Sequence, residues 1–72
     1  MNVKPRITVQ LNGEAISVLE NSTLQELIVA MGLTNKRIAI ECNGAIIPRS
    51  EYSSLLITAD HHLEIVQAIG GG

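Results

Sequence analysis

The sequence predicts an α+β fold in which a single helix packs across a mixed β-sheet. Runs of alternating apolar and polar residues flank two Asn-Gly pairs, at 12–13 and 43–44, and a further apolar run precedes the glycines at 70–72. Between the two pairs, apolar residues at 24–31 recur with the i, i+3, i+4, i+7 spacing of one helix face. Strands on both sides of one helix, within 72 residues, predict one small domain.

Residues 7–11 and 15–19 are predicted to form a β-hairpin. Asn12 and Gly13 lie between them, and this pair readily adopts the positive φ values of a tight hairpin turn. Because successive strand residues point to opposite faces, one set of apolar side chains is directed toward the core. This set consists of Ile7, Val9 and Leu11 on the first strand and Ile16 and Val18 on the second.

A helix of about ten residues is predicted to follow the hairpin, because the apolar stripe has helical spacing. Thr23 with Glu26 fits a capping box at its start, and Ser22 with Gln25 would fit the same motif. Gly32 fits the left-handed residue that ends many helices. The stripe that faces the core is Leu24, Leu27, Ile28 and Met31.

Two further strands are predicted beyond the helix, at residues 37–42 and 45–47. The second is short because Pro48 cannot donate to a strand ladder. Residues 50–52 would open a short helical turn, after which three apolar residues would pack under the sheet. These residues are Leu55, Leu56 and Ile57.

The last strand is predicted to run from His62 to Ile69, so that residues 1–69 form the domain and 70–72 form a flexible tail. With this order of elements, the first and last strands lie side by side in parallel, as in the ubiquitin-like β-grasp fold. Glycine has no Cβ, so three extended tail residues, spanning roughly 10 Å, could enter a channel too narrow for side chains. The sequence therefore predicts that the Gly72 carboxylate is presented to the active site of another protein.

Composition and charge argue against several kinds of partner and site. A net charge of −2, a pI near 5.5 and a single aromatic residue argue against nucleic-acid binding. No apolar run reaches the ~20 residues that span a bilayer, and the N-terminus lacks the apolar segment of a secretory signal. We therefore expect no membrane contact and a cytoplasmic location. The single cysteine cannot form an internal disulfide, and no Cys/His spacing predicts a metal site.

No set of side chains combines a nucleophile, a base and an orienting group, which indicates that the chain is not an enzyme. His61 and His62 would point to opposite faces of a strand and could not bind one metal ion together. Cys42 is in phase with Ile38 and Ile40, which favours a buried side chain over a sulfur-relay thiol.

An apolar patch is predicted on the last strand, outside the core. Val66 and Ala68 alternate with the inward-facing residues of that strand and lie close to the glycines, so they are candidates for docking to a partner. Arg49 and Glu51 are interpreted as solvated surface charges, since single surface charges seldom contribute much.

Several short motifs occur together along the chain. They are the Asn-Gly pairs at 12–13 and 43–44, Thr-Leu-Gln-Glu-Leu at 23–27, Ile-Pro-Arg at 47–49, Glu-Tyr at 51–52 and Gly-Gly at 71–72. In combination, and over essentially the whole chain, they resemble the ThiS family, the ubiquitin-like sulfur carriers of thiamine biosynthesis.

This resemblance implies a function for the C-terminal glycines. An E1-like, ThiF-type adenylyltransferase would use ATP to adenylate the Gly72 carboxylate, with Gly70 and Gly71 threaded into its active site. A sulfur donor such as a cysteine desulfurase system would then convert the carboxylate to a thiocarboxylate. A ThiG-type thiazole synthase would take this sulfur for the thiazole ring of thiamine. The chain itself would bind no cofactor and would serve as a cosubstrate.

Two alternatives share the predicted fold. A small subunit of molybdopterin synthase would carry sulfur for another pathway, but that type is usually longer and richer in aromatic residues. A noncovalent ubiquitin-like interaction module would have only a frayed tail. A carrier, in contrast, requires the chain to end at Gly72 with a free carboxylate.

Overall fold

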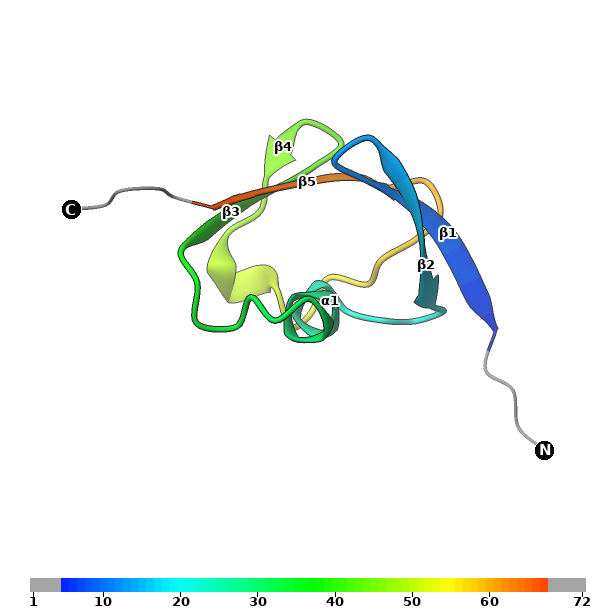
Figure 1. Ribbon diagram of the computed structural model, residues 1–72, viewed down its shortest axis with the longest axis horizontal. Coiled ribbons are helices and arrows are strands. Elements are labelled where there is room, and N and C mark those ends of the chain that lie inside the picture. The colour runs from blue at the N-terminus through cyan, green and yellow to red at the C-terminus, as the bar shows by residue number, and fades with distance from the viewer. Residues whose placement is uncertain (1–4, 68–72) are drawn as a thin grey trace.

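The computed structural model describes residues 5–67, which form a five-stranded sheet with one helix packed against one of its faces (Figure 1). The strand order in the sheet is β2-β1-β5-β3-β4, so the last strand is central, and the predicted α+β class is confirmed. In chain order the elements are β1 (Arg6–Leu11), β2 (Glu14–Leu19), α1 (Leu24–Ala30), β3 (Ile38–Cys42), β4 (Ala45–Ile46), a 3₁₀ turn (Arg49–Glu51) and β5 (His62–Gln67).

β1 and β2 form the predicted hairpin, with Asn12 and Gly13 at its turn. Their φ values of 51° and 83° lie in the left-handed region that such a turn requires. The strands pair antiparallel in a register that places the apolar residues of both strands on one face. Three of these residues are buried, namely Val9, Leu11 and Val18, and two are partly buried against the core, namely Ile7 and Ile16.

α1 begins as predicted but is shorter than predicted. Thr23 is the N-cap: its Oγ1 accepts a hydrogen bond from the Glu26 N–H at 3.1 Å, and Glu26 Oε1 accepts one from the Thr23 N–H at 2.8 Å. The helix has seven residues, because Gly32, with a φ of 74°, ends it early. Met31 is therefore the C-cap and is 41% exposed, so its predicted place in the buried stripe was wrong.

β5 lies in the middle of the sheet, as the β-grasp arrangement predicts. It pairs parallel with β1, and this pairing stops at Leu11 and Leu63. On its other side it pairs antiparallel with β3, and this pairing continues to Ile38 and Gln67. The second half of β5 therefore has a neighbouring strand on one side only.

The connection between β4 and β5 differs from the prediction in the bounds of its helical turn and in the exposure of Leu56. The short helical turn forms at Arg49–Glu51, and Tyr52, which follows it, is buried in the core. Ile57 is also buried, whereas Leu56 is 49% exposed and does not pack under the sheet. Leu56 forms an isolated antiparallel bridge with Thr23, so the chain is extended here and neighbouring side chains point in opposite directions.

Candidate functional site

The predicted reactive end of the chain continues from β5. At Gln67, the last described residue, β5 is still paired with Ile38 of β3. Ala68 and the glycines 70–72, with the predicted domain boundary, lie outside the described residues. Their roles stay predictions, while the structure defines the strand that leads to them.

Asn12 takes the place of a strand beside the second half of β5. Its backbone N–H donates to the carbonyl oxygen of Leu63 at 2.8 Å, where pairing with β1 stops. Its side chain contacts Ile65, the next residue of β5 whose backbone N–H and carbonyl point to this side of the strand. Oδ1 accepts from the Ile65 N–H at 2.9 Å, and Nδ2 donates to the Ile65 carbonyl at 3.3 Å. Both backbone polar groups of Ile65 are thereby satisfied where β1 no longer reaches.

Asn43 holds the start of β5 from the opposite side. Its N–H donates to the His62 carbonyl at 2.9 Å, and its Oδ1 accepts from the His62 N–H at 2.7 Å. The sequence pattern places Asn12 and Asn43 in turns only and does not indicate these contacts. The available signal was the presence of Asn, which carries both a donor and an acceptor, at both turns.

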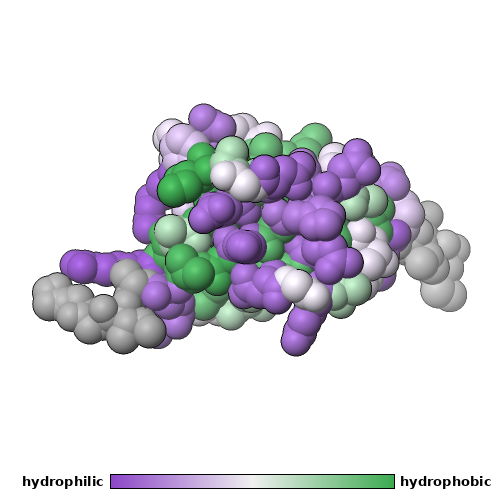
Figure 2. Space-filling view, turned by 90° about the horizontal axis from the view of Figure 1, so that it is seen from above, coloured by the Kyte–Doolittle hydropathy of each residue, from purple (hydrophilic) through white to green (hydrophobic). Residues whose placement is uncertain are grey.

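Val66 projects from the face of the sheet opposite the helix, as predicted. It is 61% exposed, whereas Leu63 and Ile65 on the other face are 1% and 7% exposed. Ala39 of β3, also exposed, lies directly opposite Val66. Figure 2 looks onto this side of the molecule, where the surface is mostly hydrophilic and the hydrophobic surface is divided into patches. The predicted exposure of Val66 is thus found, while its role in docking, and that of Ala68, stays a prediction.

Cys42 belongs to the core. Its side chain is 8% exposed, and burial raises the pKa of the thiol above its ordinary value. The thiolate is the nucleophilic form, so a raised pKa makes this thiol less reactive near neutral pH. These properties agree with the predicted structural role of Cys42.

Two kinds of feature are not found within residues 5–67. No three His, Cys, Asp or Glu side chains in this range lie close enough together to hold a metal ion. The one α-helix described here is also too short to cross a membrane. His61 Nδ1 accepts a hydrogen bond from the Thr58 N–H at 3.1 Å, which gives this histidine a local structural contact.

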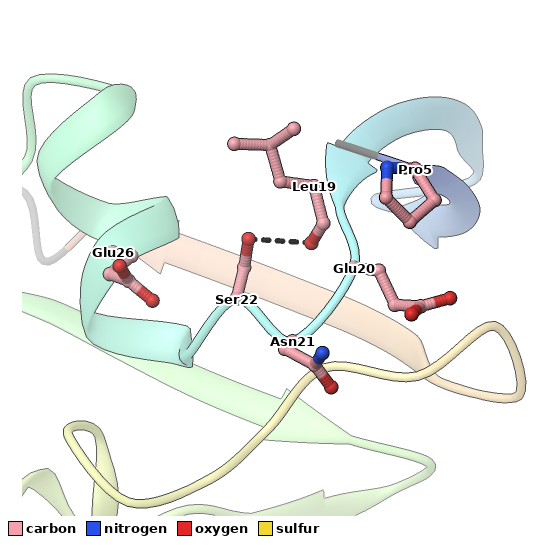
Figure 3. Close-up of a pocket in the computed structure, with 6 residues that line it drawn as sticks. All are labelled: Pro5, Leu19, Glu20, Asn21, Ser22 and Glu26. Atoms are coloured by element: carbon pink, nitrogen blue, oxygen red, sulfur yellow. Dashed lines mark hydrogen bonds between the residues drawn. The ribbon is translucent and has the colours of Figure 1, made fainter. Parts of the chain in front are cut away.

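A polar hollow lies beside the connection from β2 to α1 (Figure 3). This connection is remote from the end of β5 (Figure 1). The side chains of Glu20 and Ser22 line it, and Ser22 Oγ donates to the Leu19 carbonyl at 2.6 Å. Glu26 also lines it but is engaged in the helix cap. None of the described residues lining this hollow is a His or Cys, so Ser22 has no histidine base there and the hollow does not resemble a nucleophilic site.

The sequence is similar to proteins of known families. The sequence model of the ThiS family matches residues 5–72. The sulfur carrier protein ThiS of Bacillus subtilis is 33% identical over 64 residues, which cover 88% of this chain and 97% of that protein. A thiazole synthase of Magnetococcus marinus is 33% identical over 64 residues, which cover 89% of this chain and 20% of that protein. The chain thus spans about a fifth of the length of the thiazole synthases that it matches.

The fold is similar to that of a solved structure, the thiamine biosynthesis protein ThiS from Geobacter metallireducens. The TM-score is 0.76, at 22% sequence identity, with 90% of this chain and 99% of that chain covered. This similarity confirms the predicted ubiquitin-like β-grasp fold. Together with the match to the family over residues 5–72, it leads to one assignment. The chain belongs to the ThiS family of sulfur carrier proteins.

Proposed function

We propose that the chain carries sulfur as a thiocarboxylate on Gly72 for formation of the thiazole ring of thiamine. The observation that carries this proposal is the match to the ThiS family, which extends through the glycines 70–72. The position of β5 gives further support. The backbone N–H groups of His62 and Ile65 donate hydrogen bonds to Oδ1 of Asn43 and of Asn12, and these contacts hold β5, which in the sequence comes just before the glycines. A reaction at Gly72 would therefore leave the folded domain undisturbed.

The proposed chemistry requires an activating partner, because a carboxylate is a poor electrophile. A ThiF-type adenylyltransferase would transfer AMP from ATP to the Gly72 carboxylate and release pyrophosphate, with Gly70 and Gly71 in its narrow entrance. The sulfur of a donor such as a cysteine desulfurase system would then displace AMP. Where this sulfur arrives as a persulfide, the product is an acyl disulfide, and a thiol reductant must supply two electrons to release the thiocarboxylate. In this scheme the partner binds ATP. The chain is a cosubstrate: it catalyses no reaction and binds no cofactor.

A ThiG-type thiazole synthase is the proposed acceptor of the sulfur. Regions similar to this chain occur within longer proteins named thiazole synthase, which supports an acceptor of this type. Val66 is exposed shortly before the tail, and Ala68 would follow it on the same face. Docking through this apolar surface would position both the domain and the sulfur in one encounter.

Intact-mass spectrometry tests the carrier chemistry. The carrier chemistry requires that the protein isolated from its own cells ends at Gly72. If further residues followed, Gly72 would have a peptide carbonyl and no free carboxylate to activate. Incubation with the adenylyltransferase, ATP, the sulfur donor and a thiol reductant should then replace one oxygen of the Gly72 carboxylate by a sulfur. A variant lacking Gly71 and Gly72 is the control, and it should keep its melting temperature but show no exchange. Absence of exchange in the full chain would contradict the proposal.

A reconstitution experiment separates the two sulfur pathways. The thiocarboxylate form is supplied to thiazole synthase in one reaction and to the large subunit of molybdopterin synthase in another. We expect product from the first reaction only. Product from the second reaction alone would overturn the thiamine assignment. A stable complex without any sulfur transfer would favour a noncovalent interaction module.

The docking role of Val66 can be tested with a matched pair of variants. Val66→Asp should weaken the complex with thiazole synthase, because it places a charge in the centre of the proposed contact. Val29→Asp is the control, since Val29 is similarly exposed, at 56%, but lies on α1. Equal binding by both variants would exclude Val66 from the contact.

A further inference from the structure

A hollow beside the end of β5 is lined by basic side chains. Arg37 and Arg49 line it together with Val66 and Gln67. Arg37 directly precedes Ile38, the residue of β3 that pairs with Gln67, so it lies next to the point from which the tail continues. Arg49 reaches the same hollow from the 3₁₀ turn. Two arginines therefore line the same hollow as Val66, which is the last exposed apolar residue of the chain within residues 5–67.

A second hollow adds another basic residue to this end of the molecule. It shares Ile38 and Arg49 with the first hollow and is also lined by Lys36. The two hollows thus contain three of the chain's five Lys and Arg residues. None of the described residues that line them is an Asp or Glu. In a chain with a net charge of −2, the described lining of these two hollows is therefore locally positive.

Charges elsewhere on the molecule are arranged differently. Glu41 and Glu64 lie opposite each other on β3 and β5, so the middle of the sheet is acidic. Arg6 lies at the start of β1, at the opposite end of the molecule (Figure 1). Its guanidinium is engaged within the hairpin, because Nε donates to Ser17 Oγ at 2.7 Å and a terminal nitrogen donates to the Ser17 carbonyl at 3.1 Å. The basic residues near the tail are therefore a separate group.

We infer that the thiazole synthase presents acidic residues around the opening that receives the tail, and that Arg37 and Arg49 orient the carrier on this acidic rim. The inference rests on the proposed function. Val66 would supply the apolar centre of the contact, and a guanidinium can donate two parallel hydrogen bonds to a carboxylate. An acidic protein surface suits the patch better than a nucleic acid does, because the chain as a whole is negative and almost lacks aromatic residues.

Charges at the rim of an interface act mainly on the rate of association and on its dependence on salt. The test therefore measures the association rate of the full chain with purified thiazole synthase, by surface plasmon resonance over a series of salt concentrations. The double variant Arg37→Glu, Arg49→Glu should associate about tenfold more slowly at low salt, and its rate should depend less on salt. Arg49→Lys keeps the charge and should retain most of the rate.

Arg6→Glu is the control for the single variants Arg37→Glu and Arg49→Glu, because all three make the same change in net charge. It should alter the association rate by no more than about twofold. Melting temperatures must show that each variant is folded. An equally large loss with Arg6→Glu would overturn the inference in favour of general charge attraction. A rate independent of salt in the unaltered chain, or RNA binding that requires Arg37 and Arg49, would also overturn it.

This measurement needs neither ATP nor a sulfur donor, so its result does not depend on the carrier chemistry. A salt-dependent complex that requires Arg37 and Arg49, formed by a chain that never acquires sulfur, would contradict the proposed function and leave the docking surface supported. Normal sulfur exchange at Gly72, combined with unchanged association of the double variant, would contradict the docking surface alone.

Discussion

The two Asn-Gly turns have nearly the same backbone conformation but different contacts with β5. Asn12 and Asn43 have φ values of 51° and 52°, and the glycines that follow have values of 83° and 85°. Each asparagine also donates its backbone N–H to a carbonyl of β5, that of Leu63 or of His62. Their side chains differ, because Asn43 accepts one hydrogen bond, whereas Asn12 both accepts from and donates to Ile65.

The difference follows from what lies beside β5 at each turn. On the β3 side, strand pairing continues from Cys42 to Ile38, along the rest of β5. On the β1 side, the chain turns away after Leu11 and leaves Ile65 without a strand next to it. The amide of Asn12, with one acceptor and one donor, supplies the two groups that a strand residue would have offered. The Asn-Gly pair closes a hairpin at both sites. At 12–13 its asparagine side chain also continues the hydrogen bonding along the edge of β5.

The largest effect is expected for Leu63, which lies on β5 between the two turns. Leu63 is paired with both Leu11 and Cys42, the residues that precede the two asparagines, and it is 1% exposed. Leu63→Ala should lower the free energy of unfolding by about 3 kcal/mol, because it removes buried methyl groups and leaves a cavity. Urea unfolding measures this loss. Val66→Ala on the same strand should change stability by no more than about 0.5 kcal/mol. Similar losses for both variants would show that β5 does not support the core in this way.

Asn12→Asp tests the side-chain contact that distinguishes the two turns. The substitution keeps the acceptor for the Ile65 N–H, but it removes the Nδ2 donor and sets a carboxylate against the Ile65 carbonyl. The free energy of unfolding should fall by about 2 kcal/mol, since a partly buried carbonyl loses its partner. Urea unfolding gives this value. Hydrogen exchange at the amides of residues 65–67 should become faster than in the unaltered chain. Unchanged exchange there would show that Asn12 does not hold the second half of β5.

Local signals predicted much of the fold correctly. The capping box of Thr23 and Glu26, the Asn-Gly turns and the alternation of the hairpin strands each depend on neighbouring residues, so the sequence displays them directly. The helix end was less well predicted. Met31 continues the apolar spacing, but the left-handed conformation of Gly32 ends the helix before Met31 can join the buried face.

Other features depend on residues that are distant in the sequence. The side chain of Asn12 contacts Ile65, 53 positions away, and no local pattern identifies that partner. Leu56 is exposed because its segment forms a bridge with Thr23, which the apolar run around it does not reveal. The exposure of Val66 could be predicted, since it depends only on alternation within one strand. The basic group near the tail could not, because Arg37 and Arg49 line one hollow only after folding.

Replacing the turn glycines should show that the two backbones are equivalent. Gly13 and Gly44 have φ values of 83° and 85°, and a Cβ built on either would meet no other atom within 4 Å. Gly13→Ala and Gly44→Ala should therefore each cost about 1 kcal/mol, from the conformation alone. Thermal unfolding of the two variants measures these costs. Unequal losses would mean that the turns differ in their backbones as well as in their asparagine side chains.

The smallest effect is expected for Asn43→Asp, the counterpart of Asn12→Asp. Asn43 uses only Oδ1, as an acceptor for the His62 N–H at 2.7 Å, and a carboxylate can accept the same hydrogen bond. Asp also tolerates the left-handed conformation, so the free energy of unfolding should change by no more than about 0.5 kcal/mol. Both variants add one negative charge, and each retains its N–H···O contact with β5. Urea unfolding in low and high salt compares the two variants and removes the effect of the added charge. If Asn43→Asp then proves as destabilising as Asn12→Asp, the donor of Asn12 cannot be what separates the two turns.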